Sequence, residues 1–235
     1  MLSSIKKLFF ISRPISWVNT AYPFAAAYLI SGGTINPLFF IATLFFLIPY
    51  NLLMYGVNDV FIAMIVLGNI AAIIGLIVLT FFVVAYSLKW LRFKERPLLD
   101  SITSSIHFAG PAVYGLLLTG FYPGAWPFII ALFLWGMASH ALGAIQDIIP
   151  DRKGNISSIA TVFGASITLR LVIILYGAAS FIVILQSLPA AIIGVAGLMY
   201  IINVVPYLGI SDKTSMKINK AWRRFIWLNM ATGFR

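Results

Sequence analysis

Asp147 and Asp151 lie four residues apart in the segment QDIIPD, and the whole chain has only six acidic residues. On a helix this spacing places both side chains on one face. Two carboxylates so close repel each other unless a cation lies between them. Their oxygens suit Mg²⁺, which commonly binds a few carboxylates together with substrate phosphates. The spacing also fits a solvated helix end that Arg152 and Lys153 neutralise, so both interpretations stay open.

A further carboxylate follows a long apolar run, where Asn58 and Asp59 are succeeded almost at once by the apolar residues FIAMIVL. Asp59 lies at the end of one predicted membrane span, and Asp147 lies at the end of a later one. Carboxylates at such boundaries are candidates for function, because a charge near the membrane interior is costly. We therefore expect both to face one cavity near the same membrane surface.

Basic residues gather in the segment AYSLKWLRFKERP, where Arg92 and Lys94 closely follow Tyr86. Arg offers a planar fork and Lys a point charge, and together they neutralise a diphosphate. The alternative is that these cations anchor a helix end to lipid headgroups. Both interpretations place the segment at the membrane boundary.

The composition indicates a membrane protein. Of the 235 residues, 61% are hydrophobic and 9% are charged, against about 25% charged residues in soluble domains. The net charge of +10 comes from Lys and Arg in short loops between apolar segments, which is typical of positive-inside topology. We therefore expect a multi-pass protein of the cell membrane that contacts lipids and does not bind nucleic acid. The chain has no Cys, which excludes disulfides and thiolate metal sites.

Seven segments have the length and apolar character that a membrane-spanning helix needs. They are residues 15–31, 37–57, 62–88, 98–119, 127–146, 167–186 and 188–209. We expect an all-α, polytopic transmembrane helical bundle that forms one membrane-embedded domain over residues 1–235. Lys6, Lys7 and Arg13 place the N-terminus in the cytoplasm, on the same side as the acidic residues.

The charge pattern disagrees with seven spans at one point. If residues 62–88 form one span, the strongly basic loop 89–96 lies outside the cell, whereas every later loop fits if 89–96 lies inside. A re-entrant turn at Gly68 and Asn69, a failure of the positive-inside bias, or the absence of one helix would each explain this. We favour an absent helix after Asp59, because FIAMIVLGN looks like the tail of a helix followed by a turn.

Three motifs follow one another in a recognisable order. They are Asn58-Asp59, then Tyr86-Ser87 with Arg92 and Lys94, and then Asp147 with Asp151. In these motifs the chain resembles the UbiA family of intramembrane prenyltransferases, which carries NDxxDxxxD after its second helix and DxxxD after its sixth. Residues 12–29 and 136–164 also look like this family, and most like the branch that includes lycopene elongase/hydratase enzymes.

The resemblance implies a transferase that moves a prenyl group from an allylic diphosphate to an apolar isoprenoid acceptor with the help of Mg²⁺. It implies that Asp59, Asp147 and Asp151 are the catalytic and metal-binding residues. It also implies that the diphosphate is bound by Asn58, Arg92, Lys94 and Tyr86. Tyr86 or Trp135 would alternatively line the pocket of the allylic cation through the ring face. The branch favours lycopene in carotenoid synthesis as the acceptor, with a quinone-ring or other lipid precursor as the alternative.

The chain departs from the family pattern after Asp59, where Ile62 and Val66 stand at positions that are acidic in the family. The family has nine helices, and its third lies where the charge pattern indicates an absent crossing. The ninth is also incomplete after Arg224. We therefore expect that the rest of the first acidic motif, one helix and the end of the last helix are absent. A truncated, inactive relative is one alternative. A small transporter is a weaker one, because the acidic residues lie at one membrane face.

Overall fold

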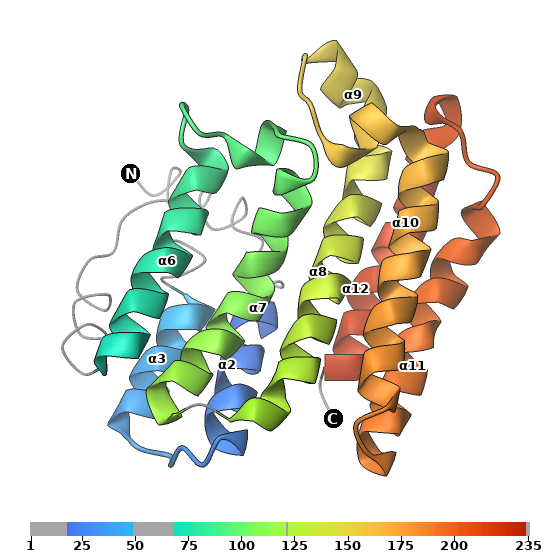
Figure 1. Cartoon of the computed structure of the whole chain (residues 1–235). Coiled ribbons are helices and arrows are strands. Elements are labelled where there is room, and N and C mark those ends of the chain that lie inside the picture. The colour runs from blue at the N-terminus through green and yellow to red at the C-terminus, as the bar shows by residue number, and fades with distance from the viewer. Residues whose placement is uncertain (1–17, 49–67, 121, 234–235) are drawn as a thin grey trace, which may run out of the picture. The chain divides into compact units, whose positions relative to one another are not determined.

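The computed structural model describes residues 18–48, 68–120 and 122–233, apart from some side chains of the last helix (Figure 1). Every regular element in these ranges is helical, which confirms the all-α prediction. Asn58, Asp59, Ile62 and Val66 lie outside the described residues, so the predictions made for them stay predictions.

Nine α-helices make up most of the described chain. They are α2 (Val18–Ile30), α3 (Pro37–Leu47), α6 (Ile70–Ser87), α7 (Leu99–Thr119), α8 (Trp126–Gln146), α9 (Ile148–Lys153), α10 (Ile159–Ile184), α11 (Leu188–Val204) and α12 (Asn219–Gly233). Four described helices are long and apolar enough to cross a membrane, namely α6, α8 with the turn before it, α10, and α11 with the turn after it. This agrees with a multi-pass membrane protein.

The helices divide into two compact units, which are described separately. In the first unit, α2 and α3 are joined by a short loop and pair antiparallel, since the Thr20 hydroxyl donates to the carbonyl of Phe46 at 2.7 Å. Aromatic rings fill the space between the helices. The ring of Phe24 lies 5.0 Å from that of Phe46 and 6.1 Å from that of Tyr114 on α7. All three aromatic rings are fully buried.

The close approach of α2 to α7 depends on glycines. A Cβ on Gly115 would come within 2.9 Å of the Phe24 carbonyl oxygen, and one on Gly33 would overlap the side chain of Thr119. Gly115 thus lies beside Phe24, and Thr119, further along α7, lies beside Gly33, further along the chain from α2. Because both contacts advance in the same order, α2 and α7 run in the same direction. Because α3 is antiparallel to α2, it is antiparallel to α7 as well.

α6 is also antiparallel to α7. Asn69, directly before α6, donates from its side-chain amide to the carbonyl of Leu117 near the end of α7 at 2.7 Å, and it also caps α6 by accepting from the backbone N–H of Ala72. Consequently α3 and α6 start at the same end of the unit. The expected span 62–88 is therefore wrong in its start, because its helix begins at Ile70.

The second unit comprises residues 85–106 and 126–235. Its buried core lies between α8 and α10 and continues to α11 and α12. Five aromatic side chains extend this core: Trp135, Tyr176, Tyr200, Trp222 and Phe225. The rings of Tyr176 and Tyr200 stack at 5.2 Å, and those of Trp222 and Phe225 at 5.0 Å. Trp135 also stacks on Phe225 at 5.7 Å, so its ring packs within this cluster.

α10 begins earlier than the expected span 167–186 because a break divides it. Gly164 has φ 78° and ψ 164°, a conformation that only glycine adopts readily. Ala165 starts the longer part of the helix. Its backbone N–H donates to the carboxylate of Asp212 at 2.7 Å. Asp212 therefore caps the second part of α10, while Ser158 caps the first.

Gly164→Ala is expected to destabilise the protein by about 1–3 kcal/mol, the usual cost of such a backbone conformation in a residue with a side chain. The added Cβ would also lie 3.1 Å from the Asp212 carboxylate and would disturb that cap. Thermal unfolding in detergent measures the effect. Gly209→Ala is the control, since nothing lies within 4 Å of its position. Equal melting temperatures for the two variants would contradict the strained break.

Candidate functional site

The acidic pair lies where α8 ends and α9 begins, in the second unit. Asp147 directly precedes α9, and the backbone N–H of Asp151 donates to its carbonyl at 2.8 Å. The two residues are therefore one helical turn apart, as their spacing predicts. Asp147 is exposed and Asp151 is half-buried. The pair thus lies at the surface end of the helices rather than within a span.

Negative charge accumulates around Asp151. The pKa of Asp151 is raised, first by partial burial and then by the nearby carboxylates of Asp147 and Glu95. The repulsion that Asp151 experiences from Asp147 and Glu95 is of the kind that a bound divalent ion would relieve. The described residues contain no set of three acidic, Cys or His side chains arranged to hold a metal by themselves. The predicted third ligand, Asp59, lies outside the described residues.

Arg152 is held by partners outside the acidic pair. Its guanidinium forms an ion pair with Asp212 at 2.7 Å and donates to the carbonyl of Thr161 at 2.8 Å. Both interpretations of the acidic pair, a metal site and a solvated helix end, stay predictions. The ion pair also ties α9 to the 3₁₀ helix η6 (Asp212–Ile218), so the same carboxylate caps α10 and holds the arginine beside Asp151.

Asp212→Asn is expected to lower the melting temperature by an amount that depends on pH. The pKa of Asp212 is lowered, mainly by the N–H of Ala165 and then by Arg152. A lowered pKa stabilises the folded protein above the ordinary value of 3.8, and this gain is lost as the pH falls through the lower folded value.

Melting curves of both proteins are measured from about pH 3 to pH 7. The melting temperature of the wild type should exceed that of Asp212→Asn by a constant amount above about pH 5, and this excess should shrink below about pH 4. Lys213→Gln, at an exposed neighbouring position, should show no such change. A difference that widens toward acidic pH would contradict the assigned role.

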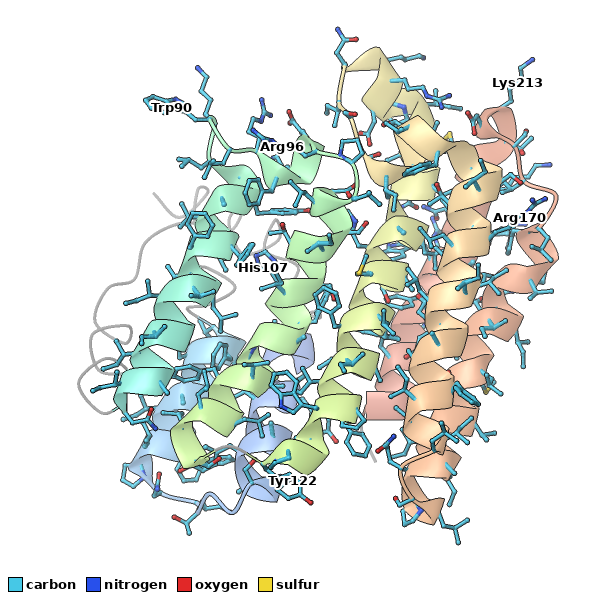
Figure 2. All side chains as sticks on the ribbon, in the orientation of Figure 1. Trp90, Arg96, His107, Tyr122, Arg170 and Lys213 are labelled. Carbon is cyan, nitrogen blue, oxygen red and sulfur yellow. The ribbon has the colours of Figure 1, made fainter. Side chains whose placement is uncertain are left out.

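The basic loop between α6 and α7 contains a tight turn at Arg92. This residue has φ 40°, a left-handed conformation that is uncommon for a residue other than glycine. Its guanidinium pairs with Glu95 in the 3₁₀ helix η3 (Phe93–Glu95), which also contains Lys94. Trp90 and Arg96 extend from the same loop, and Trp90 is almost fully exposed (Figure 2). The loop thus presents cations and an interfacial aromatic at one end of the helices.

Glu95 connects the two halves of the predicted site. It pairs with Arg92 and acts electrostatically on Asp151, so the basic loop and the acidic pair lie close together in this unit. Sequence reasoning did not single out Glu95. Its signal was present, since it is the single acidic residue in the otherwise basic loop 89–96.

Tyr86 lies in the last turn of α6, and its hydroxyl lies 3.5 Å from the Nε2 atom of His140 on α8. The Nδ1 atom of the same imidazole lies 3.1 Å from the Ser101 hydroxyl at the start of α7. His140 is therefore a packed, hydrogen-bonded histidine, and it connects the predicted Tyr-Ser motif to two other helices.

The family follows from a comparison with known sequences. Residues 60–229 match the model of the UbiA prenyltransferase family. The chain belongs to this family. It is therefore a multi-pass membrane enzyme of the prenyltransferase type, which confirms the resemblance seen in the three motifs.

The chain is also similar to individual members of the UbiA family. It is 40% identical to a lycopene elongase/hydratase of Corynebacterium glutamicum, covering 99% of this chain and 96% of that protein. It is 38% identical to the C(50) beta-cyclic carotenoids biosynthesis protein LbtBC of Dietzia, covering 97% of this chain and 62% of that protein.

Solved structures show the same fold. A UbiA homolog from Archaeoglobus fulgidus bound to GPP and Mg²⁺ superposes with a TM-score of 0.63 at 15% identity, covering 97% of this chain and all of that one. The same homolog bound to DMAPP and Mg²⁺ gives a TM-score of 0.61 at 17% identity. At these identities the likeness establishes the helical architecture.

The comparison with the Corynebacterium relative bears on the absent helix. That alignment extends over 274 positions, whereas this chain has 235 residues, so at least 39 positions of the alignment have no residue here. A surplus of this size is about one spanning helix with a loop. The family match begins at residue 60, directly after Asp59. Neither value says where along this chain the unmatched positions fall, so the absent crossing after Asp59 stays a prediction.

Proposed function

We propose that the protein transfers a prenyl group from an allylic diphosphate to lycopene or a similar apolar isoprenoid in carotenoid synthesis. The observation that carries the proposal is the proximity of the Asp147–Asp151 pair to Glu95, which the basic turn at Arg92 holds beside it. The names of the relatives support the acceptor, and the ligands of the structural neighbours support a diphosphate with Mg²⁺.

Asp147 and Asp151 would hold Mg²⁺ together with Asp59. The donor set fits, since carboxylate oxygens that repel one another are ligands that this hard cation prefers. When bound, Mg²⁺ would supply positive charge to the diphosphate as it leaves the allylic carbon. The two carboxylates would hold the ion at the end of α8.

Arg92 and Lys94 would bind the diphosphate together with Asn58. Arg92 would exchange Glu95 for the diphosphate oxygens, for which its planar fork is suited. A partly exposed ion pair such as Arg92–Glu95 contributes little free energy, so breaking it for the diphosphate would cost little free energy. The long apolar helices would keep water away from the allylic cation until the acceptor attacks it.

We also propose that the chain forms one membrane domain and that the acidic end of the helices faces the cytoplasm. The basic loop 89–96 and the segment from Asp212 to Arg224, with five Lys and Arg residues, support this orientation. Protease protection of tags placed in loop 89–96, in sealed right-side-out vesicles, measures the orientation.

The function is tested with purified protein in liposomes that contain lycopene, dimethylallyl diphosphate and Mg²⁺. We expect a product heavier than lycopene by one five-carbon unit, with or without added water, and no product when EDTA removes the Mg²⁺. A parallel reaction contains a quinone-ring precursor in place of lycopene. Product only in the second reaction would overturn the proposed acceptor, and no product in either would overturn the proposed transfer.

A further inference from the structure

The residue directly before the acidic pair is bonded to a segment far along the chain. Gln146 ends α8 and precedes Asp147, and its side-chain oxygen accepts from the side-chain amide of Asn219 at 2.7 Å. Arg223 donates from Nε to the Oδ1 atom of Asn219 at 3.0 Å. Because an Arg side chain only donates, it must meet the oxygen of the Asn219 amide, and the amide nitrogen is left facing Gln146.

The residue directly after the acidic pair is bonded to the same segment. Arg152 follows Asp151, and its guanidinium pairs with Asp212 at 2.7 Å. Asp212 is the first residue of η6, and Asn219 directly follows the last one. The bonds on the two sides of the acidic pair therefore come from the two ends of η6. We call Asp212 and Asn219 the clamp residues.

η6 is itself fixed to the buried core of this unit. Ile218 and Ala221 are fully buried there, and the side-chain amide of Asn203 on α11 donates to the carbonyl of Ala221 at 2.9 Å. α9, in contrast, has only six residues, and a helix of that length is not stable on its own. The clamp residues thus join a short surface helix to a firmly held support.

We propose that Asp212 and Asn219 are positioning residues, which hold the turn from Asp147 to Asp151 in the arrangement that receives a divalent cation. Ligands that are already ordered spare the cation the entropy cost of ordering them on binding. Neither clamp residue contacts the cation in this proposal, since each acts through a neighbour of the acidic pair. The cation in this statement rests on the proposed function, whereas the clamp rests only on the contacts described above.

Amide hydrogen exchange in detergent, without metal or substrate, tests the clamp first. The backbone N–H of Asp151 donates to the carbonyl of Asp147, so its exchange reports the opening of this turn. Asn219→Ala should speed this exchange about fivefold, the change that one net hydrogen bond makes to a local opening equilibrium. Met216→Ala, at an exposed position of η6, should leave it unchanged. Equal exchange in Asn219→Ala and wild type would overturn the clamp.

Two further variants show whether the faster exchange comes from the bond to Gln146. Gln146→Ala combined with Asn219→Ala should exchange no faster than Asn219→Ala alone, because both changes remove the same bond. Asn219→Asp should restore slow exchange, since its carboxylate accepts from Arg223 and the Gln146 amide can turn to donate to it. Effects that multiply in the double variant, or no rescue by Asn219→Asp, would count against the bond and overturn the clamp.

Metal binding and kinetics then test what the clamp does for the cation. Asn219→Ala leaves the charge unchanged and should raise the Mg²⁺ concentration that half-saturates binding with inorganic pyrophosphate about tenfold, as loss of an outer partner of a metal site does. Excess Mg²⁺ should bring kcat for prenyl transfer back to within about twofold of the wild type. The melting temperature should change little, because the Asn219 bond is exposed.

An unchanged Mg²⁺ requirement in Asn219→Ala, a loss of kcat that excess Mg²⁺ does not restore, or a wild type that binds no Mg²⁺ with pyrophosphate would each overturn the positioning role. The proposed function fails separately. If the wild type transfers no prenyl group, the proposed function is wrong, while the exchange and pyrophosphate measurements still decide the clamp.

Discussion

Asp151→Asn is expected to lower prenyl transfer by at least about 10²-fold, because even partners of metal ligands cost 10–100-fold when they are lost. The amide keeps the shape of the side chain and its place in α9 but removes one of the charges that the metal requires. Asp147→Asn should have a similar effect. Both are measured as kcat/KM for dimethylallyl diphosphate in the liposome assay, over a range of Mg²⁺ concentrations.

The matched control is Lys153→Gln, which changes the charge by one unit at an exposed position of the same short helix. It should leave turnover nearly unchanged. Melting temperatures of all three variants should stay close to that of the wild type, since Asn keeps the size of the Asp side chain and the positions lie at the exposed or half-exposed end of the helices. Full turnover in both carboxylate variants would show that the metal is held elsewhere.

We expect a second large effect on prenyl transfer from inserting, after Asp59, the stretch of the Corynebacterium glutamicum relative that has no counterpart in this chain. We expect insertion of that Corynebacterium segment after Asp59 to raise Mg²⁺-dependent transfer at least about 10²-fold over the 235-residue chain. By the family resemblance, the insertion should supply the acidic residues that Ile62 and Val66 do not provide, and the predicted absent helix.

A matched insertion separates the two contributions. The same segment with its acidic residues replaced by Asn restores the crossing without the ligands, and it should remain close to the activity of the 235-residue chain. If the 235-residue chain is already as active as the full insertion, two carboxylates suffice for the metal and the expected loss of the first motif has no consequence.

The sequence predicted local features of the site well. The turn that joins Asp147 to Asp151 follows from their spacing, and the basic loop follows from its composition. The ion pair of Arg152 was not predicted, because its partner, Asp212, lies 60 residues further along the chain. A residue next to an acidic pair in sequence is free to pair elsewhere when a distant loop folds over it, and spacing carries no information about such a loop.

The contacts of His140 show the same limit more strongly. Tyr86 was recognised from its motif, but Ser101 and His140 come from two other helices and become neighbours only through helix packing. Helix boundaries were predicted less well than helix existence. Apolar composition did not reveal that α10 starts at Ile159, since the break at Gly164 is stabilised by a carboxylate from a later loop.

The shared direction of α3 and α6 has an electrical consequence. The loop that follows α6 carries Lys89, Arg92, Lys94 and Arg96 against Glu95, a net charge of three. Moving one elementary charge across a membrane potential of 100 mV requires about 2.3 kcal/mol, so holding this loop on the positive outer side would require about 7 kcal/mol. In an energised cell the potential itself therefore adds to the proposed orientation, in which the loop after α6 lies on the cytoplasmic side.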